Sequence, residues 1–126
     1  GWNMTPEELH ETFERGLTLA RLFNLREGMT ADDDRLPDRL HEPIRMGPLN
    51  NHILSRSEIR DYVAGYYEER GWDKEHGRPY TDTLAHLNID IDEHDVANLT
   101  SERPAPLAVG ALPYTLSLDD SNGHEE

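Results

Sequence analysis

The eight residues RLFNLREG, at positions 21–28, mark where the first predicted helix ends. Gly28 follows the last apolar residue of this run, and glycine readily adopts the left-handed conformation that ends a helix. At the other end, Thr5 is a good N-cap, Pro6 suits the first helical position, and Glu8 completes a capping box. The sequence therefore predicts a helix that begins just after Thr5 and ends before Gly28.

Apolar residues recur along this helix at steps of three and four, which places them on one face. They are Leu9, Phe13, Leu17, Ala20 and Phe23. We interpret this face as the side of the helix that packs into the core. The alternative is that it fills a groove on a partner.

A second helix is predicted after Ser55, which forms a capping box with Glu58 and precedes a helix-ending Gly71. Its apolar face comprises Ile59, Val63, Tyr66 and Tyr67. We expect Trp72, directly after this helix, and Trp2 to anchor packed edges.

Two shorter helical segments are predicted downstream. Thr81 can cap a third helix that carries Leu84 and Leu87, and Asn88 can adopt the left-handed conformation that would end it. Residues 92–99 favour one or two further helical turns.

The remaining segments are predicted to be irregular. Residues 29–54 contain three consecutive aspartates and three prolines, a composition typical of a long wrapping loop. We expect residues 100–118 to be extended and 119–126 to be disordered. The predicted fold is all-α, with three to four helices, the long loop and an irregular C-terminal tail. The predicted division is a helical domain at 1–99 and an acidic tail at 100–126.

Composition excludes several classes of function. The formal net charge of -14 at pH 7 repels phosphate backbones, so neither nucleic acid nor an anionic membrane is an expected partner. The sequence has no cysteine, which excludes a disulfide framework, a thiolate nucleophile and any cysteine-ligated cluster within the chain. No apolar run approaches the length of a membrane span and no signal pattern is present, so we expect a cytoplasmic protein.

The densest group of potential metal ligands lies near the end of the helical region. It comprises His86, Asp90, Asp92, His94 and Asp95. Asn88, Asp90 and Asp92 imitate the start of a calcium loop. However, Glu93 stands where the sharp-turn glycine belongs and Leu99 where the bidentate glutamate belongs. We interpret the segment as a solvated acidic turn, and we interpret His10 as an exposed surface imidazole. The sequence assigns no catalytic, cofactor-binding or metal residue.

Four blocks of sequence carry a family resemblance. They are RLFNLREG at 21–28, DDRLPDR at 33–39, YYEERGWD at 66–73 and PYTDTLAHL at 79–87. In this order and spacing they resemble the C-terminal helical segment of the aldehyde ferredoxin oxidoreductase family, tungsten-pterin enzymes that oxidise aldehydes to carboxylates. The likeness covers residues 1–92. Asn88 and Ile89 depart from the family's usual Gly-Leu, although asparagine also accepts the left-handed conformation.

The resemblance implies a role for the chain within a larger enzyme. In the family, a tungsten bis-pterin cofactor and a four-iron four-sulfur cluster are held by segments that precede this one. The chain would then be a C-terminal structural segment or subunit that packs against cofactor-bearing domains, helps to shape the substrate cavity, and is inactive alone. Ferredoxin would be a partner through the parent enzyme, and no cofactor is expected in this chain.

Two other functions stay open at this point. One is a free-standing acidic helical module that binds proteins and has no enzymatic activity. The other, which the sequence favours least, is a metal-dependent hydrolase that uses His86 and His94.

One local contact can be predicted from charge. Arg21 and Arg26 lie near the end of the first helix, and the acidic start of the loop follows closely. We expect both arginines to hold this loop by charge-assisted hydrogen bonds to Asp33 or Asp34.

Overall fold

The structure is a computed structural model and describes residues 3–43, 45, 47–48 and 51–106. The helices are α1 (Pro6–Arg26), α2 (Arg56–Glu69), α3 (Thr81–His86) and α4 (Glu93–Leu99), with two short 3-10 turns at Ala31–Asp33 and Asp38–His41. The described ranges contain no strand longer than an isolated bridge, and the two bridges pair Trp72 with Pro79 and Tyr80 with Ser101. The all-α prediction is confirmed.

The two long helices begin at the predicted capping boxes. The Glu8 amide donates to Thr5 Oγ1 at 3.2 Å, and the Thr5 amide donates to Glu8 Oε2 at 2.8 Å. Ser55 and Glu58 make the same reciprocal pair, at 3.1 Å in both directions. Each box satisfies two amide groups that the first turn of a helix leaves without partners.

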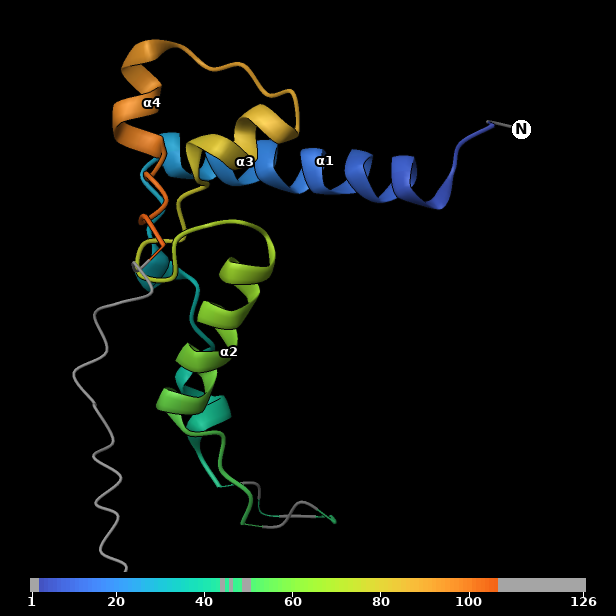
Figure 1. The fold of residues 1–126 in the computed structure, drawn as a ribbon. Coiled ribbons are helices and arrows are strands. Elements are labelled where there is room, and N and C mark those ends of the chain that lie inside the picture. Colours follow the sequence, from blue (N-terminus) through green and yellow to red (C-terminus); the bar gives the residue numbers. More distant parts are fainter. Residues whose placement is uncertain (1–2, 44, 46, 49–50, 107–126) are drawn as a thin grey trace, which may run out of the picture.

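The apolar core is small and lies at one end of α1. It is formed by Leu22, Leu84, Leu87, Ile89 and Leu99, with Leu25 and Ile91 packed against it. These side chains come from α1, α3, α4 and the turn between the last two. Figure 1 shows α3 and α4 gathered beside α1, whereas α2 extends away from them in a different direction.

The predicted core face of α1 is wrong for this chain. Leu9, Phe13 and Phe23 are 61%, 56% and 61% exposed, and Ala20 is exposed as well. The buried residues of α1 are instead Thr18, Arg21 and Leu22. The reason is that the later helices pack against the more polar side of α1.

The predicted helix ends are largely confirmed. Gly28 has a φ of 92° and Asn88 a φ of 53°, both in the left-handed region. The start of the third helix differs from the prediction, because Tyr80 is the N-cap and Thr81 is already helical. The Thr81 hydroxyl does not cap the helix, since it donates to Glu102 at 3.2 Å.

The long loop and the start of the tail are held at specific points. His41 Nδ1 donates to the Leu54 carbonyl at 2.6 Å, which closes part of the loop across the predicted irregular region. Ser101 accepts from the Thr81 amide and donates its own amide to the Pro79 carbonyl, both at 3.1 Å. The predictions for residues 107–126 and for Trp2 lie outside the described residues.

Candidate functional site

Arg21 joins three segments that are far apart in the sequence. Its side chain is 6% exposed. Nε donates to the Gly77 carbonyl at 2.9 Å, Nη1 to Asp34 at 2.7 Å, and Nη2 to the Tyr67 hydroxyl at 3.2 Å. The guanidinium also lies 5.2 Å from the centre of the Tyr67 ring and 5.5 Å from that of Trp72, within range of a cation–π attraction. Arg21 therefore links α1 to the long loop, to α2 and to the loop before α3.

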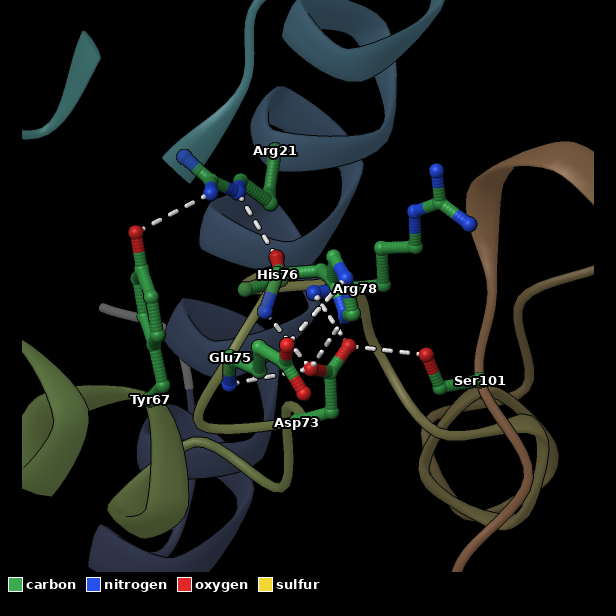
Figure 2. Close-up of polar contacts among 8 residues, drawn as sticks. Arg21, Tyr67, Asp73, Glu75, His76, Arg78 and Ser101 are labelled. Carbon is green, nitrogen blue, oxygen red and sulfur yellow. Dashed lines mark hydrogen bonds and ion pairs between the residues drawn. The ribbon is translucent and has the colours of Figure 1, made fainter. Parts of the chain in front are cut away.

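Tyr67 completes this network from α2. Its hydroxyl donates to Asp34 Oδ2, the same oxygen that accepts from Arg21. Burial and the hydrogen bond to Asp34 raise the pKa of Tyr67 to about 12, even though Arg21 acts in the opposite direction. The phenol therefore stays protonated at neutral pH and serves as a hydrogen-bond donor, not as a base. Figure 2 shows Arg21 and Tyr67 turned toward each other.

Position 77 requires a glycine. Its φ of +62° lies in the left-handed region, and an added Cβ would lie 2.6 Å from Tyr67 Cζ and would also collide with Arg21 Nη2. A larger residue could not fit without moving the Arg21 guanidinium from the Gly77 carbonyl.

Asp73 is a second point where segments meet. Its carboxylate accepts from the amides of Glu75, His76 and Arg78 at 3.1, 2.7 and 3.1 Å, and from the Ser101 hydroxyl at 2.7 Å. Burial alone would raise the pKa of Asp73, but the hydrogen bonds from His76, Ser101 and Arg78 outweigh it and hold the pKa below its usual value. Figure 2 shows these donors arranged around the carboxylate.

The residue types around Asp73 resemble those of a hydrolytic triad, but their connections do not. His76 Nδ1 lies 3.2 Å from Asp73, as an orienting contact would require. The Ser101 hydroxyl, however, donates to Asp73 and not to the imidazole. A serine nucleophile needs a base that takes its proton, and an ionised aspartate of lowered pKa is a poor one. This cluster ties the start of the tail to the loop before α3.

The prediction for the two arginines is half right. Arg21 holds Asp34 as expected. Arg26 forms no hydrogen bond to Asp33 or Asp34, both of which the structure describes, and pairs instead with Asp95 of α4. Asp33, the other expected partner, accepts instead from the Thr30 amide at 2.8 Å, in a capping contact of the first 3-10 turn.

The segment interpreted as a solvated acidic turn is largely exposed: His86, Asp90, Asp92 and His94 are exposed, and Asp95 is partly buried. Asp95 is engaged by Arg26, and His94 Nδ1 lies 3.6 Å from Asp95. Throughout the part of the chain that the structure describes, no three His, Asp or Glu side chains gather closely enough to hold a metal ion. His10 is exposed as predicted, and its imidazole lies 3.7 Å from Glu14.

Two of the cavities in the described part of the structure lie beside the long helices. One, of about 730 Å3, is lined mainly by charged and polar side chains of α1, α2 and α3, including His10, Arg70 and His86. The other, of about 510 Å3, lies between α1, α2 and the long loop. It is lined by apolar and aromatic residues, with Arg21 and Asp34 among them. The second cavity therefore has the Arg21 network in its wall.

A family model described as aldehyde ferredoxin oxidoreductase, domains 2 and 3, matches residues 1–89. The chain belongs to the aldehyde ferredoxin oxidoreductase family. A tungsten-containing aldehyde ferredoxin oxidoreductase of Pyrococcus furiosus is 37% identical over 91 residues, which cover 71% of this chain and 14% of the relative. The corresponding protein of Thermococcus kodakarensis is 35% identical over 91 residues, with the same shares of the two chains.

A further relative is named for a different activity. The aliphatic sulfonate oxidoreductase, WOR-like subunit, of Pyrococcus furiosus is 35% identical over 105 residues, which cover 79% of this chain and 17% of the relative. No solved structure matches the chain. The chain thus corresponds to a small segment of the enzymes in this family.

The donor atoms of this segment do not fit the iron-sulfur cluster that the family resemblance implies. A four-iron four-sulfur cluster is held by cysteine thiolates, and the sequence has no cysteine. Among the described side chains there is also no cluster of oxygen and nitrogen ligands that could replace them. In a tungsten enzyme of this family, the cluster ligands would have to come from other parts of the polypeptide.

The residues of the matching blocks have structural roles in the fold. Arg21 and Asp34 form a partly buried ion pair, Tyr67 and Trp72 pack on Arg21, and Gly28 ends α1. Trp72 is 4% exposed, as expected for the anchor of a packed edge. No helix in the ranges covered by the structure is long and apolar enough to cross a membrane.

Sequence reasoning missed the roles of Gly77, Asp73 and Ser101. The segment DKEHG at 73–77 does carry a signal, because an aspartate followed by a glycine is typical of a turn in which the carboxylate accepts nearby amides. The contact between Asp73 and Ser101 has no such local signal, since it depends on where the tail crosses the fold.

Proposed function

We propose that this chain is a structural segment of a tungsten-pterin enzyme that oxidises aldehydes to carboxylates. The family match over residues 1–89 carries the proposal, because the chain covers only 14–17% of the relatives that it matches. The chemistry would take place on cofactor-bearing domains outside this chain. Alone, the chain would be inactive.

The chemistry of the site supports a structural role. Arg21 and Asp73 both use their polar atoms to hold loops, and Ser101 lacks a base that could activate it. Tyr67 has a raised pKa, which makes it a poor base at neutral pH. These groups position the backbone and offer no reactive pair for a substrate.

The small core also supports the proposal that the stability of this chain depends on packing against a larger protein. Among the residues that the structure describes, seven apolar side chains form or border the core cluster. Conformational entropy opposes folding at every residue, so a chain with few buried apolar groups has little net stability by itself. Packing against the cofactor-bearing domains would supply the missing burial.

The proposal includes an electron partner, a location and a division of the chain. Ferredoxin would accept electrons from the parent enzyme, in keeping with the family's name, and the enzyme would be cytoplasmic. Residues 1–99 would form the docking domain and residues 100–126 an acidic tail.

The names of the relatives include two substrate classes. The tungsten-containing relatives are named for aldehydes, and one relative is named for aliphatic sulfonates. We favour an aldehyde, and an alkylsulfonate is the second candidate because the sulfonate relative matches the larger share of this chain. Parallel assays of the parent enzyme with an aliphatic aldehyde and an alkylsulfonate of equal chain length would separate the two.

Co-expression tests the structural role. We define the companion as the rest of the enzyme, that is, the cofactor-bearing polypeptide of the same family and organism. The definition applies whether this polypeptide is encoded continuously with this chain or separately. The tagged chain should recover the companion at a fixed ratio, together with tungsten and iron. If the chain purifies without the companion as a cooperatively folded monomer, the free-standing interaction module becomes the better description.

A further inference from the structure

The side of α1 that faces away from α3 and α4 is left uncovered by the described residues. Leu9, Phe13 and Phe23 are each more than half exposed, and Leu19 is 48% exposed. Large apolar side chains exposed together on one helix face mark an interaction surface more often than an ordinary solvent surface. We call this surface the outer face of α1.

The outer face carries no charge, although 30% of the chain's residues are charged. At 3.6 residues per turn, all the Asp, Glu, Lys and Arg residues of α1 fall on the opposite half of the helix. They are Glu7, Glu8, Glu11, Glu14, Arg15, Arg21 and Arg26. In a helix whose packing partners all lie in the same chain, the apolar face is buried and the charged face is exposed. In α1 the apolar outer face is exposed instead.

The spacing along the outer face is that of a helix-packing seam. Leu9, Phe13, Gly16, Ala20 and Phe23 follow one another at alternating steps of four and three. This alternation keeps side chains in line along a second helix packed against the first. Large residues lie at the ends of the seam and small ones in the middle, which would let a partner backbone come closest at the centre.

Gly16 supports this interpretation independently. A glycine in the middle of a helix is less favourable than alanine, so its presence needs a reason. The described fold gives none, because nothing lies within 4 Å of the position that a Cβ on Gly16 would occupy. Close approach of an external backbone would explain it. Gly65 in α2 is equally open in the isolated chain, and it lies away from the outer face.

We propose that the outer face of α1 docks an apolar helix of the companion, with Gly16 at the point of closest approach. This inference rests on the proposed function. The companion is the chosen occupant because the chain covers only 14–17% of its relatives, so most of the polypeptide in such an enzyme lies outside it. Because the outer face carries no charge, a partner that binds through ion pairs is excluded. The alternating steps of four and three along the face favour a helix as the partner element.

The neighbouring cavity extends the docking surface. Leu17 and Ala20 line the cavity of about 510 Å3 together with Tyr62 and Tyr66 of α2. A helix seated on α1 could insert side chains between the two helices there, as amphipathic helices do in apolar grooves.

Matched leucine substitutions test the docking. Gly16→Leu and Gly65→Leu both replace an open mid-helix glycine with a better helix former, so both isolated chains should melt no lower than the wild type. In co-expression, Gly16→Leu should reduce recovery of the companion at least tenfold, because the added side chain overpacks the interface. Gly65→Leu should recover it at the wild-type level. Phe13→Asp, which puts a charge on the outer face, should match Gly16→Leu.

Each other outcome has a defined meaning. If the wild-type chain recovers the companion and Gly16→Leu does so equally well, the docking face is elsewhere and the proposed function still stands. Equal losses with Gly16→Leu and Gly65→Leu would also overturn the assignment. Failure of the wild-type chain to bind the companion would refute the proposed function itself. A wild-type dimer in size-exclusion chromatography with light scattering, lost in Gly16→Leu, would assign the face to a second copy and overturn the inference.

Discussion

Replacing Arg21 with alanine should destabilise the chain far more than replacing Arg26 with alanine. Both arginines belong to α1 and both pair with an aspartate, but the Arg21 side chain is 6% exposed and that of Arg26 is 54% exposed. Breaking a buried ion pair costs about 3–5 kcal/mol, whereas an exposed pair contributes about 0–1 kcal/mol.

The structure places the expected loss for Arg21→Ala at about 3 kcal/mol, the lower end of that range. Asp34 is 23% exposed and keeps its hydrogen bond from Tyr67, so it is not left without a partner. The Gly77 carbonyl does lose its donor, and the rings of Tyr67 and Trp72 lose the guanidinium. For a domain of this size, about 3 kcal/mol lowers the melting temperature by roughly 12–24 °C.

Circular dichroism melting and urea titration measure this difference, and limited proteolysis reports the loop locally. Arg21→Ala should also speed cleavage within residues 29–43, because Asp34 no longer ties this segment to α1. Arg26→Ala should lower the melting temperature by less than about 8 °C. Equal melting shifts for the two variants, or unchanged cleavage in Arg21→Ala, would refute the assignment of Arg21 as the central link.

Four further predictions concern single groups. Gly77→Ala should cost at least about 2 kcal/mol in urea titration because of its positive φ and the collision with Tyr67, whereas Gly65→Ala should gain about 0.5–1 kcal/mol; equal effects would contradict this. Asp73 has a lowered folded pKa, so its contribution to stability is complete above about pH 4 and is lost as the pH falls further. Asp73→Asn should therefore reduce the fall in melting temperature as the pH is lowered below about 4. An unchanged fall would contradict this role of Asp73. Tyr67 has a raised pKa of about 12, so its contribution is present below pH 10 and lost between pH 10 and 12; Tyr67→Phe should remove that alkaline transition, and its persistence would exclude Tyr67 as the source. Thr18 Oγ1 is buried and has no hydrogen-bond partner among the described residues, so Thr18→Val should leave the melting temperature unchanged or raise it, and a clear fall would reveal a partner.

Local chemistry made the helix ends predictable. The capping boxes at Thr5 and Ser55 and the left-handed stops at Gly28 and Asn88 each depend on residues within a few positions of one another. Such contacts form wherever the backbone is helical, regardless of the rest of the fold. The third helix began one residue away from the prediction because Thr81 turned its hydroxyl to Glu102.

Long-range packing was less predictable. The spacing of apolar residues predicts an apolar face on α1, but it does not indicate whether the residues that pack on this face belong to the same chain. Within the described fold, Leu9 and Phe13 remain exposed, while Thr18 and Arg21 are buried. The pairing of Arg26 with Asp95 spans 69 residues and depends on where α4 docks. The contact of Arg21 with Asp34 was predictable because only 13 residues separate them.

Aldehyde-dependent reduction of a viologen dye can be measured for three samples: the purified chain, the companion, and the two co-expressed. We expect no turnover by the chain, turnover by the co-expressed pair, and a clear loss of activity or thermal stability when the companion is prepared without the chain. Turnover by the purified chain without other protein would contradict the structural role. So would a companion that is equally active and equally stable without the chain.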